Sequence, residues 1–206
     1  MFPIALVLTL GLVIALERWV YLSKAKLQNR AAFKKIQPLL ADNKYQQLYE
    51  YVKSSSAHAS KLIQSGMVTM SASRSREDIL SSMQEASMEC VPRLEKRTAY
   101  LATLANVATL LGLLGTIIGL IAAFTAVADA DPAAKATLLS QSISVAMNTT
   151  AFGLISAIPL LLIHSMLQSK TAEVIDGLDI VCVKFINAVT AKPAVNQTAS
   201  AQKSAA

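Results

Sequence analysis

The side chains that could take part in chemistry are concentrated in residues 136–169, a stretch of 34 residues without Asp, Glu, Lys or Arg. Its hydroxyl and amide side chains include Ser140, Gln141, Ser142, Ser144, Asn148, Thr149, Thr150 and Ser156. These groups donate and accept hydrogen bonds and can hold water, but none of them carries a charge. Two interpretations stay open, namely hydrogen bonds between packed helices and the wall of a hydrated pore.

Helical spacing divides these side chains between faces. At 100° per residue, Ser142, Thr149 and Ser156 fall within about 40° of one another. Thr150 falls on the neighbouring face, where small residues precede and follow it. Pro159 lies further along and removes one backbone hydrogen bond, so we expect a kink there. His164 comes next, and we interpret it as an interfacial histidine rather than a proton relay.

A second uncharged stretch, residues 98–128, is built from small side chains at helical intervals. Two series have a spacing of four: Ala108, Gly112 and Thr116, and Gly115, Gly119 and Ala123. Small residues at this spacing let helix backbones approach closely in lipid, where apolar surface gives no driving force for association. The two series predict a multi-helix bundle or an oligomer.

The composition predicts the kind of secondary structure that carries these residues. The 206 residues are 53% hydrophobic and 16% charged, against roughly 45–50% and about 25% in soluble domains. Since about 20 apolar residues cross a bilayer, both uncharged stretches predict transmembrane helices. These features exclude a soluble enzyme, a secreted disulfide scaffold and a free DNA-binding domain, although the net charge is +6.

The charge is placed in one block and predicts the topology. Residues 17–97 hold 14 Lys and Arg against 8 Asp and Glu, so this block is expected in the cytoplasm. The turn 129–135 is then outside. The apolar segment 1–16 is expected to be an uncleaved span with its N-terminus outside, and the C-terminus returns inside. Cys90 and Cys182 fall on the inner side, where we interpret them as reduced, apolar helix residues.

The expected fold is all-α, an integral membrane protein with three transmembrane helices extended by cytoplasmic helices. Within the cytoplasmic part we expect helices at 30–40, 44–53 and 57–70, and another from Arg76 that runs into the second span with a kink at Pro92. The predicted regions are a first span at 1–22, a cytoplasmic helical domain at 23–97, a second span at 98–128, a periplasmic turn at 129–135, a third span at 136–169, a cytoplasmic amphipathic helix at 170–189 and a disordered tail at 190–206.

Three motifs resemble one family. Residues 112–119, GLLGTIIG, resemble the GLxGTxxG motif in the second span of the ExbB/TolQ proton-channel subunits, which are relatives of MotA. Residues 148–159, NTTAFGLISAIP, resemble their third-span TAxGLxxAIP motif. Glu17 and Arg18 resemble the pair that often follows their first span. The resemblance covers about residues 1–190 and is strongest over 98–168.

The resemblance implies a ring of identical subunits in the bacterial inner membrane, a pentamer around two copies of a partner's single transmembrane helix. The partner is of the ExbD/TolR type, and a TonB-like energy transducer is a further one. Thr116 and Thr150 match the family's pore-facing threonines. Together with the polar residues of the third span, the candidate proton pathway is Thr116, Thr150, Thr149, Asn148 and Ser142. The candidate packing residues are Gly112, Gly115, Gly119, Gly153 and Pro159.

The implied function is conversion of the proton motive force into mechanical work on the cell envelope, such as energised outer-membrane transport. Many relatives have a glutamate five residues before the third-span threonine, where this chain has Val145. A MotA-type stator fits less well, because it has four spans and a larger inner domain. The alternative function is a non-conducting membrane scaffold that anchors a partner. An enzyme finds no support, and no metal, cofactor or nucleic acid is expected.

Overall fold

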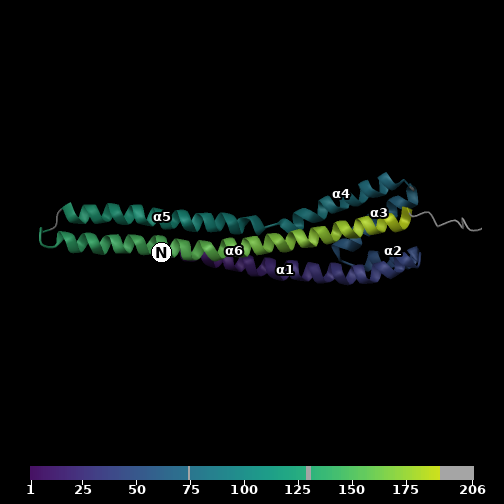
Figure 1. The fold of residues 1–206 in the computed structure, drawn as a ribbon, viewed down its shortest axis with the longest axis horizontal. Coiled ribbons are helices and arrows are strands. Elements are labelled where there is room, and N and C mark those ends of the chain that lie inside the picture. The colour runs from purple at the N-terminus through teal and green to yellow at the C-terminus, as the bar shows by residue number, and fades with distance from the viewer. Residues whose placement is uncertain (74, 129–130, 191–206) are drawn as a thin grey trace, which may run out of the picture. The chain divides into compact units, whose positions relative to one another are not determined.

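The computed structural model describes residues 1–73, 75–128 and 131–190, and its regular elements in these ranges are all helices. They are α1 (Phe2–Ala41), α2 (Tyr45–Ser54), α3 (His58–Ala72), α4 (Arg76–Glu95), α5 (Thr98–Ala128) and α6 (Lys135–Thr190), labelled in Figure 1. Three stretches are long and apolar enough to cross a membrane: Phe2–Ala41, Arg76–Ala128 and Lys135–Thr190. The chain therefore has the make-up of a multi-pass α-helical membrane protein.

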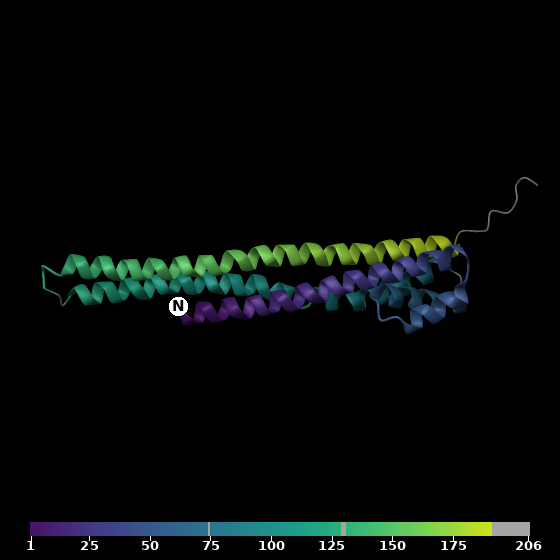
Figure 2. The ribbon, with the colours of Figure 1, turned by 90° about the horizontal axis from the view of Figure 1, so that it is seen from below.

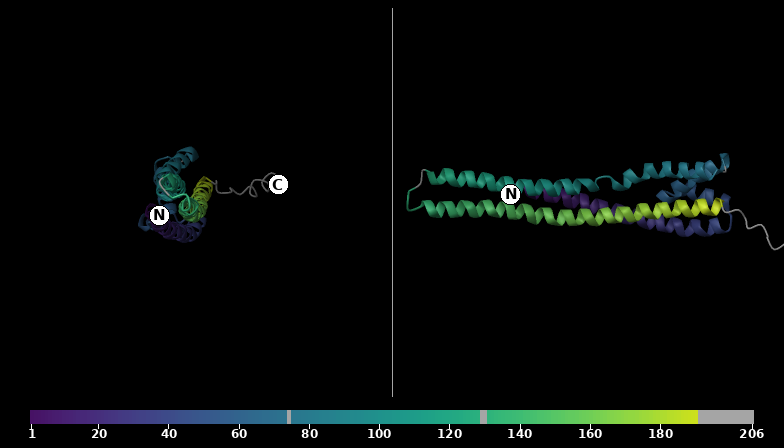
Figure 3. Two further views of the ribbon diagram at one scale, coloured as in Figure 1. Left: turned by 90° about the vertical axis from the view of Figure 1, so that its left-hand side faces the viewer. Right: turned by 45° about the horizontal axis from the view of Figure 1, so that its top comes forward.

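The helices fall into two compact units, of which the first contains Met1–Lys24 and Arg93–Glu173. In this unit α5 and the first part of α6 lie side by side, as the views in Figures 1 and 3 agree. Their contact face is made of small residues, among which Ala105, Ala108 and Ala123 are fully buried on α5. The start of α1 also packs in this unit, where Gly11 lies against Leu160 of α6.

The second unit contains α2, α3, most of α4, and the later parts of α1 and α6. Its core is apolar and includes Ile36, Leu62, Met83 and Phe185, which are fully buried. Gly66 of α3 leaves room for two of these side chains, because an added Cβ would lie 2.8 Å from Met83 Sδ and 3.0 Å from Phe185 Cε1. The burial of apolar faces from five helices stabilises this unit.

The prediction of a separate helix at 30–40 was wrong. Helix α1 is continuous from Phe2 to Ala41, as Figure 2 shows, and it passes through residues 23–29 without interruption. That segment, SKAKLQN, contains Lys, Ala, Leu and Gln, which favour helices, and no Gly or Pro to end one. A shift from apolar to polar composition therefore marks a change of environment here, and not the end of the helix.

The prediction that one helix runs from Arg76 into the second span was also wrong. Helix α4 includes Pro92 and ends at Glu95, and α5 begins at Thr98. Between them Arg97 has a φ of 66°, a left-handed conformation that commonly ends helices. The helix is thus interrupted at Lys96, four residues after Pro92. Of the predicted regions, residues 129–130 and 191–206 lie outside the described residues.

Candidate functional site

Two threonine hydroxyls meet where α5 and α6 are in contact. Thr116 of α5 and Thr150 of α6 are hydrogen bonded to each other. Both also reach the carbonyl oxygen of Gly112, at 3.3 Å from Thr116 Oγ1 and 2.9 Å from Thr150 Oγ1. Each hydroxyl has one proton and two lone pairs, so lone pairs remain on this half-buried pair. The pair can accept further hydrogen bonds from water or from a protonated group.

Glycine makes this contact possible. A Cβ added to Gly112 would lie 3.1 Å from the Cα of Gly153 on the facing helix. A Cβ added to Gly153 would lie 2.9 Å from the carbonyl oxygen of Ala108, which is backbone and cannot turn away. The two backbones are therefore close enough for the hydroxyl of Thr150 to reach a carbonyl on α5.

The other packing glycines continue this contact along α5. A Cβ on Gly115 would overlap the methyl group of Thr149, and a Cβ on Gly119 would lie 2.6 Å from the Cβ of Ala146. Pro159, predicted with these residues, is exposed and lies within an uninterrupted α6. Its neighbour Leu160 is the buried residue, packed on Gly11.

The five candidate pathway residues do not share one face. Thr149 directs its methyl group to Gly115, while its hydroxyl donates to the carbonyl of Val145 at 3.1 Å. Ser142 is half-buried and Asn148 is exposed. Asn148 lies about 160° around α6 from Thr150, since two residues turn the helix by about 200°. Of these five residues, Thr116 and Thr150 are hydrogen bonded to each other, and a pathway that includes the other three stays a prediction.

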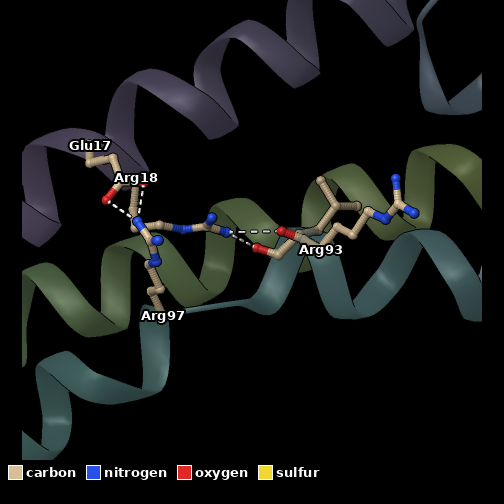
Figure 4. A network of polar contacts seen from close by, with 5 residues as sticks. Glu17, Arg18, Arg93 and Arg97 are labelled. Atoms are coloured by element: carbon tan, nitrogen blue, oxygen red, sulfur yellow. Dashed lines mark hydrogen bonds and ion pairs between the residues drawn. The ribbon is translucent and has the colours of Figure 1, made fainter.

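The role of Arg18 was not predicted from the sequence. This residue of α1 is 4% exposed, and its Nη2 donates to the carbonyls of Leu94 and Arg93, the latter at 3.5 Å. In a continuous helix, the N–H groups of residues 97 and 98 would bond these carbonyls, but the break between α4 and α5 removes them. Figure 4 shows the guanidinium group of Arg18 at the end of α4.

The residue before Arg18 contacts the other side of the same break. Glu17 accepts two hydrogen bonds from Nη1 of Arg97, at 2.7 and 2.8 Å (Figure 4). Close by along α1, Lys170 Nζ of α6 lies 3.2 Å from the centre of the Trp19 ring. Charged residues directly after an apolar span were the sequence signal for this network, but their partners are about 80 residues away.

The helices that carry the threonine pair bring no carboxylate to it. Residues 98–128 and 136–169 contain no Asp or Glu. The nearest titratable side chain within residues 136–169 is the half-buried His164. Among the described residues, no three His, Cys, Asp or Glu side chains form a group that could hold a metal ion. The site is therefore one of hydroxyl and carbonyl groups.

The chain is similar to proteins of one known family. A family model described as the MotA/TolQ/ExbB proton channel family matches residues 54–179. An ExbB homologue named as a biopolymer transport protein, from Methanothermobacter thermautotrophicus, is 32% identical over 109 residues, which are 52% of this chain and 38% of the relative. TolQ of Haemophilus influenzae, named as a Tol-Pal system protein, is 34% identical over 91 residues, which are 44% of this chain and 40% of the relative.

An ExbB-like protein of Synechocystis is 34% identical over 89 residues, 43% of this chain and 42% of the relative. The matched part spans about two fifths of the length of these relatives. The family match covers more than half of the chain and includes both the glycine motif of α5 and the threonine motif of α6. The chain therefore belongs to the MotA/TolQ/ExbB proton channel family and is of the ExbB/TolQ type.

Proposed function

We propose that this chain is the ring-forming subunit of a proton channel in the bacterial inner membrane. Its N-terminus is periplasmic, its C-terminus is cytoplasmic, and α2, α3 and α4 lie in the cytoplasm. The ring, a pentamer, surrounds the single transmembrane helices of a dimeric ExbD/TolR-like partner. Together they convert the proton motive force into mechanical work on the cell envelope, with a TonB-like protein as a further partner. The family and the basic charge of residues 17–97 support this proposal.

The observation that carries the proposal is the contact of Thr116 and Thr150 at the glycine-lined crossing of α5 and α6. Neither hydroxyl titrates, so neither can carry a proton through the bilayer alone. An isolated charge in the bilayer core costs at least several kcal/mol, and a titratable group must therefore come from elsewhere. We infer that the partner's helix brings an aspartate to the level of this pair, whose lone pairs accept a hydrogen bond from the protonated carboxyl group or from the water that carries its proton.

Reconstitution tests the proposal. Vesicles containing the subunit, the partner or both are loaded with a pH-sensitive dye, and proton flux is measured after a potential is applied. We expect flux only when both proteins are present. Thr116→Val with Thr150→Val should keep the ring assembled and lower the flux at least tenfold. Thr149→Val is the matched control, because it keeps the methyl group that packs on Gly115.

Three outcomes would contradict the proposal. Strong flux from the subunit alone would contradict a proton carrier supplied by the partner. A stable complex without any flux would instead identify the chain as a non-conducting scaffold, the competing function. Full flux in the Thr116→Val, Thr150→Val double variant would show that these hydroxyls only contribute to packing between helices.

A further inference from the structure

The later part of α1 has an exposed basic face. This part of the helix buries Ala25, Ala32 and Ile36 in the second unit. On the opposite side it exposes Leu27, Arg30, Ala31 and Lys34, and Leu27 is 69% exposed. Residues 25–41 include Lys26, Arg30, Lys34 and Lys35 and no acidic residue. An apolar strip with basic residues along it is therefore left uncovered.

The later part of α6 has the complementary composition. It buries Val174, Leu178, Val181 and Phe185 in the same unit. Its opposite side exposes Asp176, Asp179, Ile180 and Val183, and the last two are 53% and 54% exposed. Gly177 lies about 100° around α6 from Asp176, at the edge of this face, and an added Cβ there would meet no atom within 4 Å. The exposed face of α6 therefore also combines apolar side chains with charged ones, which here are carboxylates.

The charges of the two faces are not matched within the subunit. Among the residues that the structure describes, Arg30, Lys34, Asp176 and Asp179 have no ion-pair or hydrogen-bond partner. Exposed charges need no partner in water, but large apolar side chains beside them on two separate faces are typical of protein contacts. The opposite signs of the two faces favour their contact with each other.

The basic face of α1 and the acidic face of α6 also lie at about the same height, measured along the helix axes. Lys184 Nζ of α6 lies 4.8 Å from the centre of the Phe33 ring of α1, so residues 33 and 184 lie at about the same height along these helices, to within the reach of a lysine side chain. Both helices run in the same direction there, as Figure 2 shows. At an equal rise per residue, Arg30 is then level with residue 181 and Lys34 with residue 185. The basic face and the acidic face overlap in height within about one helical turn.

Equal height matters because subunits of a ring in a membrane are related by rotation about an axis normal to the bilayer. A patch can then contact only patches at its own height on the next copy. We propose that the basic face of α1 in one subunit docks on the acidic face of α6 in the next copy of this chain. This heterologous contact repeats around the ring and closes it, and it rests on the ring assembly proposed above.

A second copy fits both faces better than a lipid surface does. An anionic bilayer surface attracts Arg30 and Lys34 but repels Asp176 and Asp179 at the same height. A second copy places Arg30 close to the level of Asp179 and covers Leu27, Ile180 and Val183 at the same time. Of these two candidates, only a second copy of this chain would contact both faces.

Disulfide cross-linking tests the contact directly. Ala31→Cys is introduced into a tagged copy and Val183→Cys into an untagged copy, both in a Cys90→Ala, Cys182→Ala background, and the two are coexpressed. With copper phenanthroline as oxidant in membranes, we expect a cross-link between tagged and untagged chains. Pairing Ala31→Cys with Lys53→Cys on α2 is the control and should give less than a tenth of that product. A single chain with both Ala31→Cys and Val183→Cys should give a ladder of products that ends at the ring size.

Charge reversal provides an independent test. Arg30→Glu with Lys34→Glu, or Asp176→Lys with Asp179→Lys, should each weaken oligomer association about tenfold, whereas all four changes together should restore it. Lys53→Glu is the control with one exposed charge reversed outside both faces. Native mass measurement gives the oligomeric state of each variant. An intact ring without the Ala31–Val183 cross-link overturns this contact alone, and a monomeric parent protein overturns the ring as well. An intact ring in Arg30→Glu, Lys34→Glu that has lost binding to anionic vesicles assigns the basic face to lipid and also overturns the contact.

Discussion

The guanidinium group of Arg18 donates a hydrogen bond to the carbonyl oxygen of Leu94, a residue 76 positions further along the chain. Leu94 lies in the last turn of α4, whose carbonyls lose their helical donors because Arg97 is left-handed. A side chain of α1 thus replaces main-chain donors at the break between α4 and α5. A buried cationic donor is well suited to this position, because charged hydrogen bonds are stronger than neutral ones.

We predict that Arg18→Gln destabilises the subunit by about 1.5–3 kcal/mol, the usual contribution of a hydrogen bond to a charged group. Thermal unfolding in detergent measures the change. Glu17→Gln is the matched control, because it removes an exposed ion pair with Arg97 and should cost about 0–1 kcal/mol. Equal losses in the two variants would show that the carbonyl contacts of Arg18 contribute nothing beyond surface charge.

The small-residue spacing predicted close helix packing because its information is local, whereas Thr116 and Thr150 were brought together only by the family resemblance. The spacing of Gly112, Gly115 and Gly119 on one segment and of Thr150 and Gly153 on another defines two faces, and a short connection brings them together. The Arg18 contact could not be predicted in this way. Its partners are main-chain carbonyls, and the break that frees them occurs at Arg97, an arginine where glycine is the usual signal for positive φ.

The continuity of α1 shows a second limit of sequence patterns. The change from apolar to polar residues near Glu17 marks where the helix leaves an apolar environment, but nothing in residues 23–29 ends it. The distribution of the polar side chains of α6 was likewise only partly predictable. Helical spacing separated Thr149 from Thr150, whereas the burial of Ser156 and the exposure of Asn148 depend on which faces other helices cover.

The second prediction concerns the close approach of α5 and α6. Gly153→Ala places a Cβ 2.9 Å from the carbonyl oxygen of Ala108, so the helices must move apart. We expect lower thermal stability and, in the reconstituted complex, lower proton flux. Gly177→Ala is the matched control, since its Cβ meets no atom within 4 Å and alanine favours a helix interior by about 0.5–1 kcal/mol. An unchanged melting temperature in Gly153→Ala would contradict the packing role.

The third prediction concerns topology. Ser56→Cys lies between α2 and α3 and Ala133→Cys precedes α6, and both positions are exposed. In a Cys90→Ala, Cys182→Ala background, an impermeant thiol reagent added to cells with a permeabilised outer membrane should label Ala133→Cys. Ser56→Cys should be labelled only after the inner membrane is opened. The reverse pattern would invert the orientation derived from the basic charges of residues 17–97.

The last prediction concerns Cys182, whose thiol is buried on α6 in the second unit. Burial first, and then the nearby carboxylate of Asp179, raise the pKa of Cys182 from its ordinary value of 9.0 to about 11. The folded protein therefore favours the neutral thiol. Its contribution to stability is complete below pH 9 and is lost as the pH rises from about 9 towards 11.

Alkylation of Cys182 in a Cys90→Ala variant checks this shift, because only the thiolate reacts. In the folded protein the rate should rise about tenfold per pH unit up to at least pH 10, whereas in denaturant it should level off near pH 9. Asp179→Asn is expected to lower the pKa slightly and to move the folded-state curve towards lower pH, because it removes the negative charge and leaves the burial. A folded-state curve that coincides with the denatured one would show that Cys182 is accessible and that this face of α6 is not packed in the second unit.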